Sequence, residues 1–497
     1  MFSHLRPKIH HHSDSTPPPL PYADLFAISC VCRYWREVAV SSTELWAHII
    51  LTTPRDCDVP EMVSIARLCA RRSGARPLDF FYTPLREVLT EEQYFIPGRH
   101  RLRSVVYGSV DDPPGDELAR FLLPALHLER LYVKGVGRQI PSPFSNTVPR
   151  LRELALSRCT LGWPNPHFNS LTSLSLLRQR DIDADIYPLL EAIRCSPRLE
   201  ELFLDNESKS RVEQQHQPPG HDISTTPLHS LKRLHVCRLS AGAIKHLFAA
   251  FVLLPSRVSM RFADISADFG AIFPETITPL LSPRAATKLE LIYPGSHLGR
   301  RWETNGAIIH ATNGTAHMRW TDRSYQGCDQ IFRWIGAKPH GVYTLKEVWL
   351  HIGRHANYEL LPRDALRDLE KLVIENAADK EFDFKFSQVL SPGEDGVPFP
   401  LLSTLELRNV LSVEHYERVL EARSAAGSRL RVLRMRWSDG REAMMAPLAQ
   451  FVDKLEFYHA TGEPPRGLEL PKECTTRAGW WEPWPRGFGK DRGTLAD

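Results

Sequence analysis

The stretch Leu151-Arg-Glu-Leu154-Ala-Leu156 carries the pattern that decides the fold. The same spacing of leucines returns as Leu171-Thr-Ser-Leu-Ser-Leu176 and as Leu199-Glu-Glu-Leu-Phe-Leu204. The last two leucines of each copy lie two residues apart, which is the alternation of a short strand with one buried face. The pattern therefore predicts a series of short strands that present leucines to one core.

Further copies of Leu-x-x-Leu-x-apolar extend this series in both directions. The strict ones are Leu128/Leu131/Val133, Leu231/Leu234/Val236, Leu369/Leu372/Ile374, Leu402/Leu405/Leu407 and Leu430/Leu433/Met435. Looser ones are Leu102/Val105/Tyr107, Val258/Met260, Leu289/Leu291, Leu345/Val348/Leu350 and Val452/Leu455/Phe457. Chance would give roughly three strict copies in such a chain, so the excess indicates a repeat.

Such a repeat buries its apolar face only against its neighbours, so consecutive strands should pair. We predict that residues 131–133, 154–156, 174–176, 202–204 and 234–236 are consecutive neighbours in one parallel sheet. The stretches 186–193, 244–251 and 413–420 have the apolar period of a helix. Strand and helix then alternate in right-handed α/β coils, and the fold class is a solenoid. The array resembles the divergent leucine-rich repeats of intracellular proteins, with Asn206 and Asn409 near their customary asparagine.

A different pattern precedes the repeats. Apolar residues Leu25, Ile28, Cys32, Trp35 and Ala39 form a helical stripe over residues 24–39, and Asp24 is placed to cap or open that helix. We expect Trp35 to be largely buried, so that Trp35→Ala costs ~3–5 kcal/mol. Residues 45 and 46, Leu-Trp, begin a further apolar element of a compact helical bundle.

This region resembles the second half of an F-box, in the form numerous in mushroom-forming fungi. The matching residues are Leu20-Pro21, Asp24-Leu25, Ile28-Ser29, Val31-Cys32-Arg33, Trp35-Arg36, Ala39 and Leu45-Trp46. Residues 1–5 resemble the tail of the first F-box helix, 13–19 the polar insertion that often follows it, and 72–78 the join to the first repeat. The usual Leu-Pro-x-Glu opening is absent, so we expect weak adaptor docking and a coding segment upstream that restores the opening.

The resemblance implies a substrate-recognition subunit of a cullin–RING ubiquitin ligase. Residues that would contact the Skp adaptor are Leu20, Pro21, Leu25, Ile28, Val31 and Trp35. Through that adaptor the chain would reach a cullin, while the leucine-rich repeats hold a protein substrate. The subunit would itself perform no catalysis. An alternative is a repeat scaffold without a ubiquitin role, and an enzyme is a third hypothesis. The expected domains are 1–55 (all-α, with an insertion at 6–19), 56–470 (repeats) and 471–497 (cap or tail).

The composition of the sequence bears on which other classes of protein the chain could belong to. The chain has 42% apolar and 24% charged residues and a formal net charge of +3. No apolar run approaches the roughly 20 residues of a membrane helix, the N-terminus does not resemble a secretory signal, and the charge balance does not favour nucleic acid. Nine cysteines without Cys-x-x-Cys spacing indicate a reducing compartment, cytoplasm or nucleus.

Motifs for chemistry are absent from the sequence. No phosphate loop, nucleophile elbow or His-Glu-x-x-His is present, so we expect no catalytic residue, cofactor or metal. The histidines at 4 and 10–12 fit a solvated polar insertion better than a metal site. Cys30 and Cys32 are expected to have core roles. The tryptophans at 480, 481 and 484 fit either a ligand anchor or a cap on the last repeat.

Overall fold

The structure of the chain is a computed structural model. The structure describes residues 23–52, 59–83, 99–108, 125–140, 148–161, 169–179, 182, 186–206, 228–250, 258–265, 286–292, 305–311, 314–320, 345–352, 363–376, 380–394, 396–409, 412–437 and 445–459. The predictions for Leu20, Pro21, the polar insertion and the C-terminal tryptophans lie outside these residues. The chain divides into two compact units, whose described residues run from 23 to 231 and from 232 to 459.

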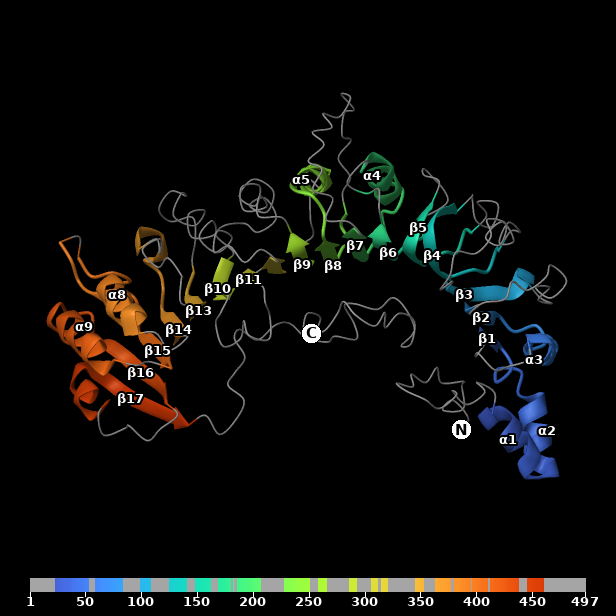
Figure 1. The fold of residues 1–497 in the computed structure, drawn as a ribbon, viewed down its shortest axis with the longest axis horizontal. Coiled ribbons are helices and arrows are strands. Elements are labelled where there is room, and N and C mark those ends of the chain that lie inside the picture. Colours follow the sequence, from blue (N-terminus) through green and yellow to red (C-terminus); the bar gives the residue numbers. More distant parts are fainter. Residues whose placement is uncertain are drawn as a thin grey trace. The chain divides into compact units, whose positions relative to one another are not determined.

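The first unit is an α/β structure with a parallel sheet (Figure 1). Its elements are α1 (Ala23–Val31), α2 (Arg33–Ser41), β1 (His48–Thr52), α3 (Val59–Arg72), β2 (Leu78–Thr83), the short η2 (Arg99–Arg101), β3 (Leu102–Gly108), β4 (Arg130–Ile140), β5 (Glu153–Leu161), β6 (Ser173–Gln179), α4 (Tyr187–Arg194) and β7 (Glu201–Asn206). Each strand from β1 to β7 pairs in parallel with the next.

The leucines of the repeated pattern stack in register across this sheet. Leu131 pairs with Leu154, Leu154 with Leu174, and Leu174 with Leu202. All four are at most 3% exposed, so they form the core of the unit. The prediction that these four motifs are consecutive neighbours in a parallel sheet is confirmed. Because side chains alternate along a strand, the residues between these leucines project from the opposite face.

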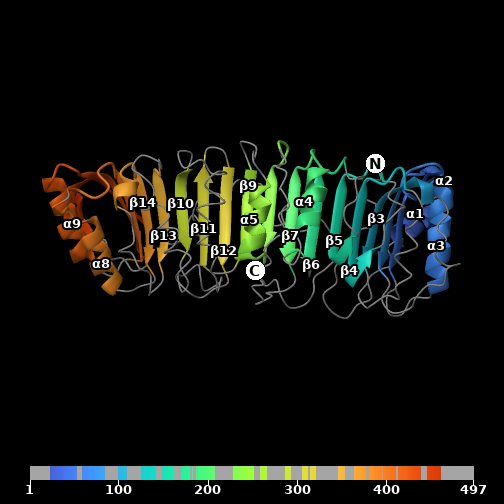
Figure 2. The same ribbon diagram turned by 90° about the horizontal axis from the view of Figure 1, so that it is seen from above.

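The second unit repeats this arrangement with one insertion. Its elements are β8 (Arg233–Cys237), α5 (Ala241–Ala249), β9 (Val258–Ile265), β10 (Ala286–Ile292), β11 (Asn305–Ala311), β12 (Gly314–Trp320), β13 (Glu347–Ile352), η8 (Arg363–Leu366), β14 (Lys371–Asn376), α8 (Lys380–Leu390), β15 (Thr404–Arg408), α9 (Val413–Ala425), β16 (Leu430–Trp437), η9 (Ala446–Phe451) and β17 (Val452–His459). The strands from β13 to β17 are consecutive parallel neighbours, and β13 also pairs with β10 (Figure 2).

A hairpin separates β9 from β10. Strands β11 and β12 pair antiparallel, β12 pairs in parallel with β9, and β11 pairs antiparallel with β10. Residues 311 and 314 are partners, so two residues connect the strands, which is the commonest length for a hairpin connection. The expectation that every repeat strand pairs with the next repeat strand is therefore wrong here. The predicted strand at 234–236 is β8, which pairs with β9, and its pairing with 202–204 stays a prediction.

The predicted helices at 186–193, 244–251 and 413–420 are present as α4, α5 and α9. Helices α8 and α9 lie on one side of β14–β17 (Figure 1), and their buried residues include Phe386, Tyr416 and Leu420. The prediction of alternating strand and helix is confirmed for these segments.

The same backbone conformation occurs after the last apolar residue of several motifs. Four residues have a φ between 52° and 56° and lie two positions after the last apolar residue of a motif: Arg158, Arg178, Arg238 and Asn409. Residues other than glycine seldom adopt this left-handed region. Its return at one position of the pattern indicates that the motifs share a turn as well as a strand.

Candidate interaction surfaces

The helical segment before the sheet is broken at Cys32. Helix α1 ends at Val31 and α2 begins at Arg33, while Cys32 itself is extended, with φ −160° and ψ 172°. Its Sγ accepts a hydrogen bond from the Trp35 backbone N–H at 3.5 Å. The predicted single helix over 24–39 is therefore wrong. Cys30 and Cys32 are both exposed, which also corrects their expected core roles.

Trp46 fixes this helical pair to the rest of the first unit. Its side chain is fully buried, and its Nε1 donates to the Ala39 carbonyl oxygen at 2.7 Å. The ring of Phe26 meets it edge-on at 6.3 Å, and the guanidinium of Arg72, from α3, lies 4.4 Å from its centroid. The segment after it is a strand, β1, so the expected all-α character of residues 1–55 is wrong at its end.

The predicted adaptor contacts fall into two groups. Leu25 is buried, at 3% exposed, and Ile28 and Trp35 are half-buried. Trp35 is therefore less buried than the helical stripe predicted, and Trp46 is the tryptophan at the core. By contrast Val31 is 68% exposed. Tyr34, which the sequence interpretation missed, is 69% exposed. These two side chains flank the break at Cys32, and we call them the α1–α2 patch.

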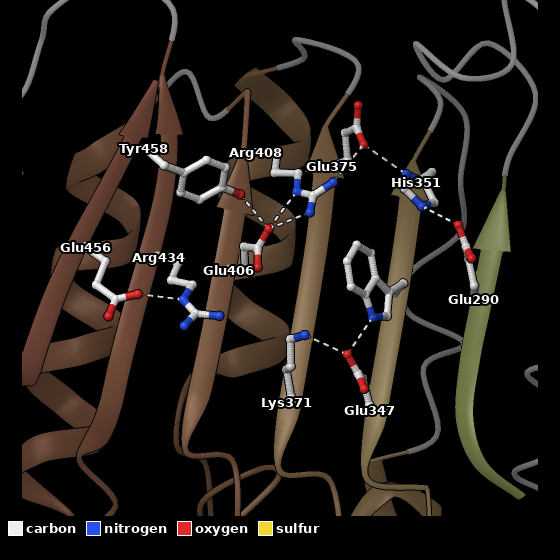
Figure 3. Close-up of polar contacts among 11 residues, drawn as sticks. Glu290, Glu347, His351, Lys371, Glu375, Glu406, Arg408, Arg434, Glu456 and Tyr458 are labelled. Carbon is white, nitrogen blue, oxygen red and sulfur yellow. Dashed lines mark hydrogen bonds and ion pairs between the residues drawn. The ribbon is translucent and has the colours of Figure 1, made fainter. Parts of the chain in front are cut away.

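The open face of the second unit carries a network of charged side chains. Figure 3 shows them on β10 and β13–β17, projecting from the face opposite the helices. Two rows cross these strands in register: Glu290, Trp349, Val373, Glu406, Arg434 and Glu456 in one, and His351, Glu375, Arg408, Arg436 and Tyr458 in the other. The sequence interpretation assigned no role to these residues.

His351 sits between two carboxylates at one end of this network. Its Nε2 lies 2.8 Å from Glu290 Oε1, and its Nδ1 lies 2.9 Å from Glu375 Oε2. Burial alone would lower the pKa of His351, but the hydrogen bonds to the two carboxylates raise it to about 9. At neutral pH the ring is therefore an imidazolium that donates from both nitrogens.

Arg408 continues the network toward the next strands. The Nε of Arg408 donates to Glu406 Oε1 at 2.7 Å, and its Nη1 lies 3.7 Å from Glu375 Oε2. The guanidinium also stacks 4.9 Å from the Trp349 ring. On the far side, the hydroxyl of Tyr458 donates to the same Glu406 oxygen across β16. We call the connected set Glu290, His351, Glu375, Arg408, Glu406 and Tyr458 the charged belt.

Further ion pairs flank the charged belt. Glu347 accepts hydrogen bonds from Lys371 at 2.6 Å and from the Trp349 Nε1 at 2.9 Å, and Lys288 lies 2.9 Å away. Burial would raise the pKa of Glu347, but these donors outweigh it and lower that pKa to about 2. Among the described residues, no group of histidine, cysteine and acidic side chains could hold a metal ion. The face is therefore equipped for ionic and hydrogen-bonded contacts with a partner.

The open face of the first unit has a different composition. Val106, Tyr132 and Ala155 form a buried cluster in register, with Phe81 and Leu177 packed against it. We call these five residues the apolar cluster. The hydroxyl of Tyr132 donates to Glu153 at its edge.

The carboxylate of Asp79 pairs with the basic side chains near this cluster. Asp79 accepts hydrogen bonds from Arg103 at 3.0 and 2.6 Å, and the Nδ1 of His48 lies 3.1 Å away. Burial would raise the pKa of Asp79, but the hydrogen bonds from His48 and Arg103 lower it to about 2. Asp79 is therefore ionised throughout the neutral range.

Comparison with known families identifies the N-terminal region. Residues 18–52 match the F-box-like family, a span that contains α1, α2 and β1. No curated protein matches the chain. Within the described residues, no helix combines the length and apolar character needed to cross a membrane. An F-box-like domain suggests a ubiquitin-ligase adaptor or another protein-interaction role, and proteins with this domain are typically not enzymes.

Proposed function

We propose that the chain is the substrate-recognition subunit of a Skp–cullin–F-box ubiquitin ligase, acting in the cytoplasm or nucleus. The observation that carries this proposal is the F-box-like match, which coincides with the helical pair that exposes Val31 and Tyr34. Large apolar side chains exposed together are typical of protein-binding surfaces. The α1–α2 patch would contact the Skp adaptor, with Ile28 and Trp35 supporting it from below.

The strands would hold the protein substrate. We propose that they form a leucine-rich repeat solenoid, supported by the leucines in register and by the left-handed turn that returns at Arg158, Arg178, Arg238 and Asn409. Solenoids of this kind present one continuous open face to a ligand. Catalysis would come from the ligase partners, and this subunit would contribute the proximity of substrate and conjugating enzyme.

Capture of the Skp adaptor by the tagged full chain tests the docking step. Val31→Asp places a charge in the α1–α2 patch and should reduce capture by about tenfold or more, because burying an unpaired carboxylate costs several kcal/mol. Leu126→Asp is a matched control, since Leu126 is also exposed, at 52%, and precedes β4. It should leave capture unchanged.

The alternative is a repeat scaffold that binds a partner without a ubiquitin role. The charged belt favours a binding function whether or not an adaptor docks, because it lies in the other unit. If the unsubstituted chain captures no adaptor, the ligase proposal fails and the scaffold proposal stands. If Val31→Asp and the parent chain capture it equally, the α1–α2 patch is not the adaptor contact.

A further inference from the structure

Arg436 differs from the other described cations on the open face of the second unit, Lys288, Lys371, Arg408, Arg434 and Lys454, which each pair with a carboxylate. It lies on β16 between Arg408 and Tyr458, its register partners on β15 and β17, and is half-buried. Within the part of the chain that the structure describes, no carboxylate lies within ion-pair distance of its guanidinium. Its neighbour Arg434, two residues earlier, is paired with Glu456 at 2.6 Å.

The carboxylates that could neutralise Arg436 are already occupied. Glu406 accepts from both Arg408 and Tyr458, and Glu375 accepts from His351. On β15–β17 the open face has four cations, Arg408, Arg434, Arg436 and Lys454, against the two carboxylates of Glu406 and Glu456. Glu375 on β14 adds a third carboxylate, which pairs with His351, lies 3.7 Å from Arg408 and interacts electrostatically with Arg436. This part of the face therefore carries an excess of positive charge that the described side chains do not balance.

The pairing of Arg408 with Arg436 has an electrostatic cost. Neighbouring strands lie about 4.8 Å apart, and like charges directly opposite each other destabilise a sheet. A guanidinium does not deprotonate in proteins, so a change of protonation cannot relieve the repulsion. An anion that lies over β16 can relieve it by pairing with Arg436, since Arg408 is buried, at 1% exposed, and already paired with Glu406.

We propose that the β15–β17 part of this face binds an acidic segment, rich in aspartate or glutamate, with Arg436 as its central contact. The proposal rests on the proposed function only in assigning that segment to the protein substrate. Glu456 serves both Arg434 and Lys454, at 2.6 Å from each, so a second unbalanced charge lies beside Arg436.

The spacing of these charges favours carboxylates. Arg434 and Arg436 lie two residues apart on β16, which corresponds to about 7 Å along a strand. Alternate residues of an extended peptide have the same spacing, whereas the oxygens of one phosphate are much closer together. Two carboxylates at alternate positions would match the two sites, and each guanidinium can hold a carboxylate with two parallel hydrogen bonds.

The test uses the full chain and a fluorescein-labelled hexaglutamate peptide, followed by fluorescence anisotropy at low ionic strength. We expect saturable binding of hexaglutamate and none of hexalysine. Arg436→Gln should weaken binding by about tenfold or more, because it removes the charge and the paired hydrogen bonds that hold the carboxylate. Arg431→Gln is the matched control. Arg431 is an exposed arginine at the start of the same strand, and its alternation places it off the open face.

Several results would overturn the proposal: no binding of hexaglutamate, equal binding by Arg436→Gln and the parent chain, or equal weakening by Arg431→Gln. Displacement of the peptide by inorganic phosphate at equal charge would show a single-dianion site and also overturn it. The melting temperature of Arg436→Gln separates a binding role from a structural one. It should not fall, since the change removes a repulsion.

Failure of this inference is distinguishable from failure of the proposed function. Arg436→Gln should keep full adaptor capture, and Val31→Asp should keep full hexaglutamate binding. Loss of adaptor capture in Arg436→Gln would mean that the variant disturbs the whole chain, which would overturn Arg436 as a specific contact.

Discussion

The open faces of the two units differ although their strands follow the same pattern. In the first unit the positions between the apolar residues of the motifs hold the apolar cluster around Val106, and Asp79 forms an ion pair with Arg103 nearby. In the second unit the equivalent positions hold Glu290 and Glu406 on either side of the buried apolar pair Trp349 and Val373. The other members of the charged belt lie two residues further along, in the next row of the same face. The leucines thus maintain one type of sheet, while the residues between them are free to vary and give each unit its own surface chemistry.

The two surfaces should also differ in how they contribute to stability. Apolar groups contribute in proportion to the area removed from water, about 25 cal/mol per Å². A buried ion pair costs desolvation free energy that its attraction only partly offsets, so its net contribution is small while the loss of one partner is expensive. The charged belt should therefore be sensitive to pH and to the loss of one partner of a pair, whereas the apolar cluster should be insensitive to pH.

The largest expected effect comes from removing the cation at the centre of the charged belt. Arg408→Met leaves Glu406 and Glu375 buried without their arginine and should lower the local free energy of unfolding by ~3–5 kcal/mol. Native-state hydrogen exchange on peptides from β13 to β15 measures this. Lys454→Met, at an exposed position, should change it by less than about 0.5 kcal/mol.

The double variant Glu406→Met with Arg408→Met sharpens this test. Removing both partners eliminates the uncompensated charge, so most of the lost stability should return. A neutral Arg408→Met variant, or a double variant less stable than the single one, would contradict the description of the belt as a coupled network.

His351 should make the second unit sensitive to alkaline pH. Its pKa is about 9 in the folded chain against the ordinary value of 6.5 for histidine, so its stabilisation is complete below pH 6.5 and is lost as pH rises through 9. The shift corresponds to roughly 3 kcal/mol. Hydrogen exchange of β13 and β14, corrected for the intrinsic rate at each pH, should show this loss.

His351→Gln serves as the control for this titration. The variant cannot change charge between pH 6.5 and 9, so its local stability should be nearly constant there, although lower than that of the parent chain at pH 6.5. If the alkaline loss were the same in His351→Gln, another group would be responsible.

The first unit should respond at the opposite end of the pH scale. Asp79 has a pKa of about 2 in the folded chain against the ordinary value of 3.8 for aspartate, so its stabilisation is complete above pH 3.8 and is lost as pH falls through 2. The expected loss is roughly 2–3 kcal/mol in β1–β3. Asp79→Asn should abolish this acid transition, and its persistence in that variant would disprove the assignment.

The sequence predicted the leucine core because its spacing is local. It also contains a signal for α3, since Met62, Ala66, Cys69 and Ala70 have helical spacing. The break at Cys32 has no such signal, because the apolar stripe continues across it.

The charged belt was not predictable from spacing. His351 is 61 residues from Glu290, and Tyr458 is 52 residues from Glu406. Single charged residues between leucines are common on solvated surfaces, and only the register of the strands shows which of them meet. The α1–α2 patch was half predicted: the resemblance selected Val31, but Tyr34 lies off the stripe and became visible only through its exposure.

The smallest expected effect comes from a matched pair of substitutions, Tyr132→Phe and Tyr458→Phe. Each keeps the aromatic ring and removes one hydroxyl that donates to a glutamate, Glu153 in the first unit and Glu406 in the second. Glu153 is half-buried and can exchange the lost donor for water, so Tyr132→Phe should cost about 0.5–1 kcal/mol.

Glu406 has less access to water, since it is 5% exposed, and it depends on the donors within the charged belt. Tyr458→Phe should therefore cost more, about 1–2 kcal/mol, while Arg408 still neutralises the carboxylate. Hydrogen exchange of β4–β5 and of β15–β17 in the two variants gives both values in the same chain. Equal losses of stability in the two variants, or a larger loss in Tyr132→Phe, would contradict this prediction. The two glutamates would then depend on their tyrosine donors to the same extent on both faces, and the apolar cluster and the charged belt would differ in composition alone.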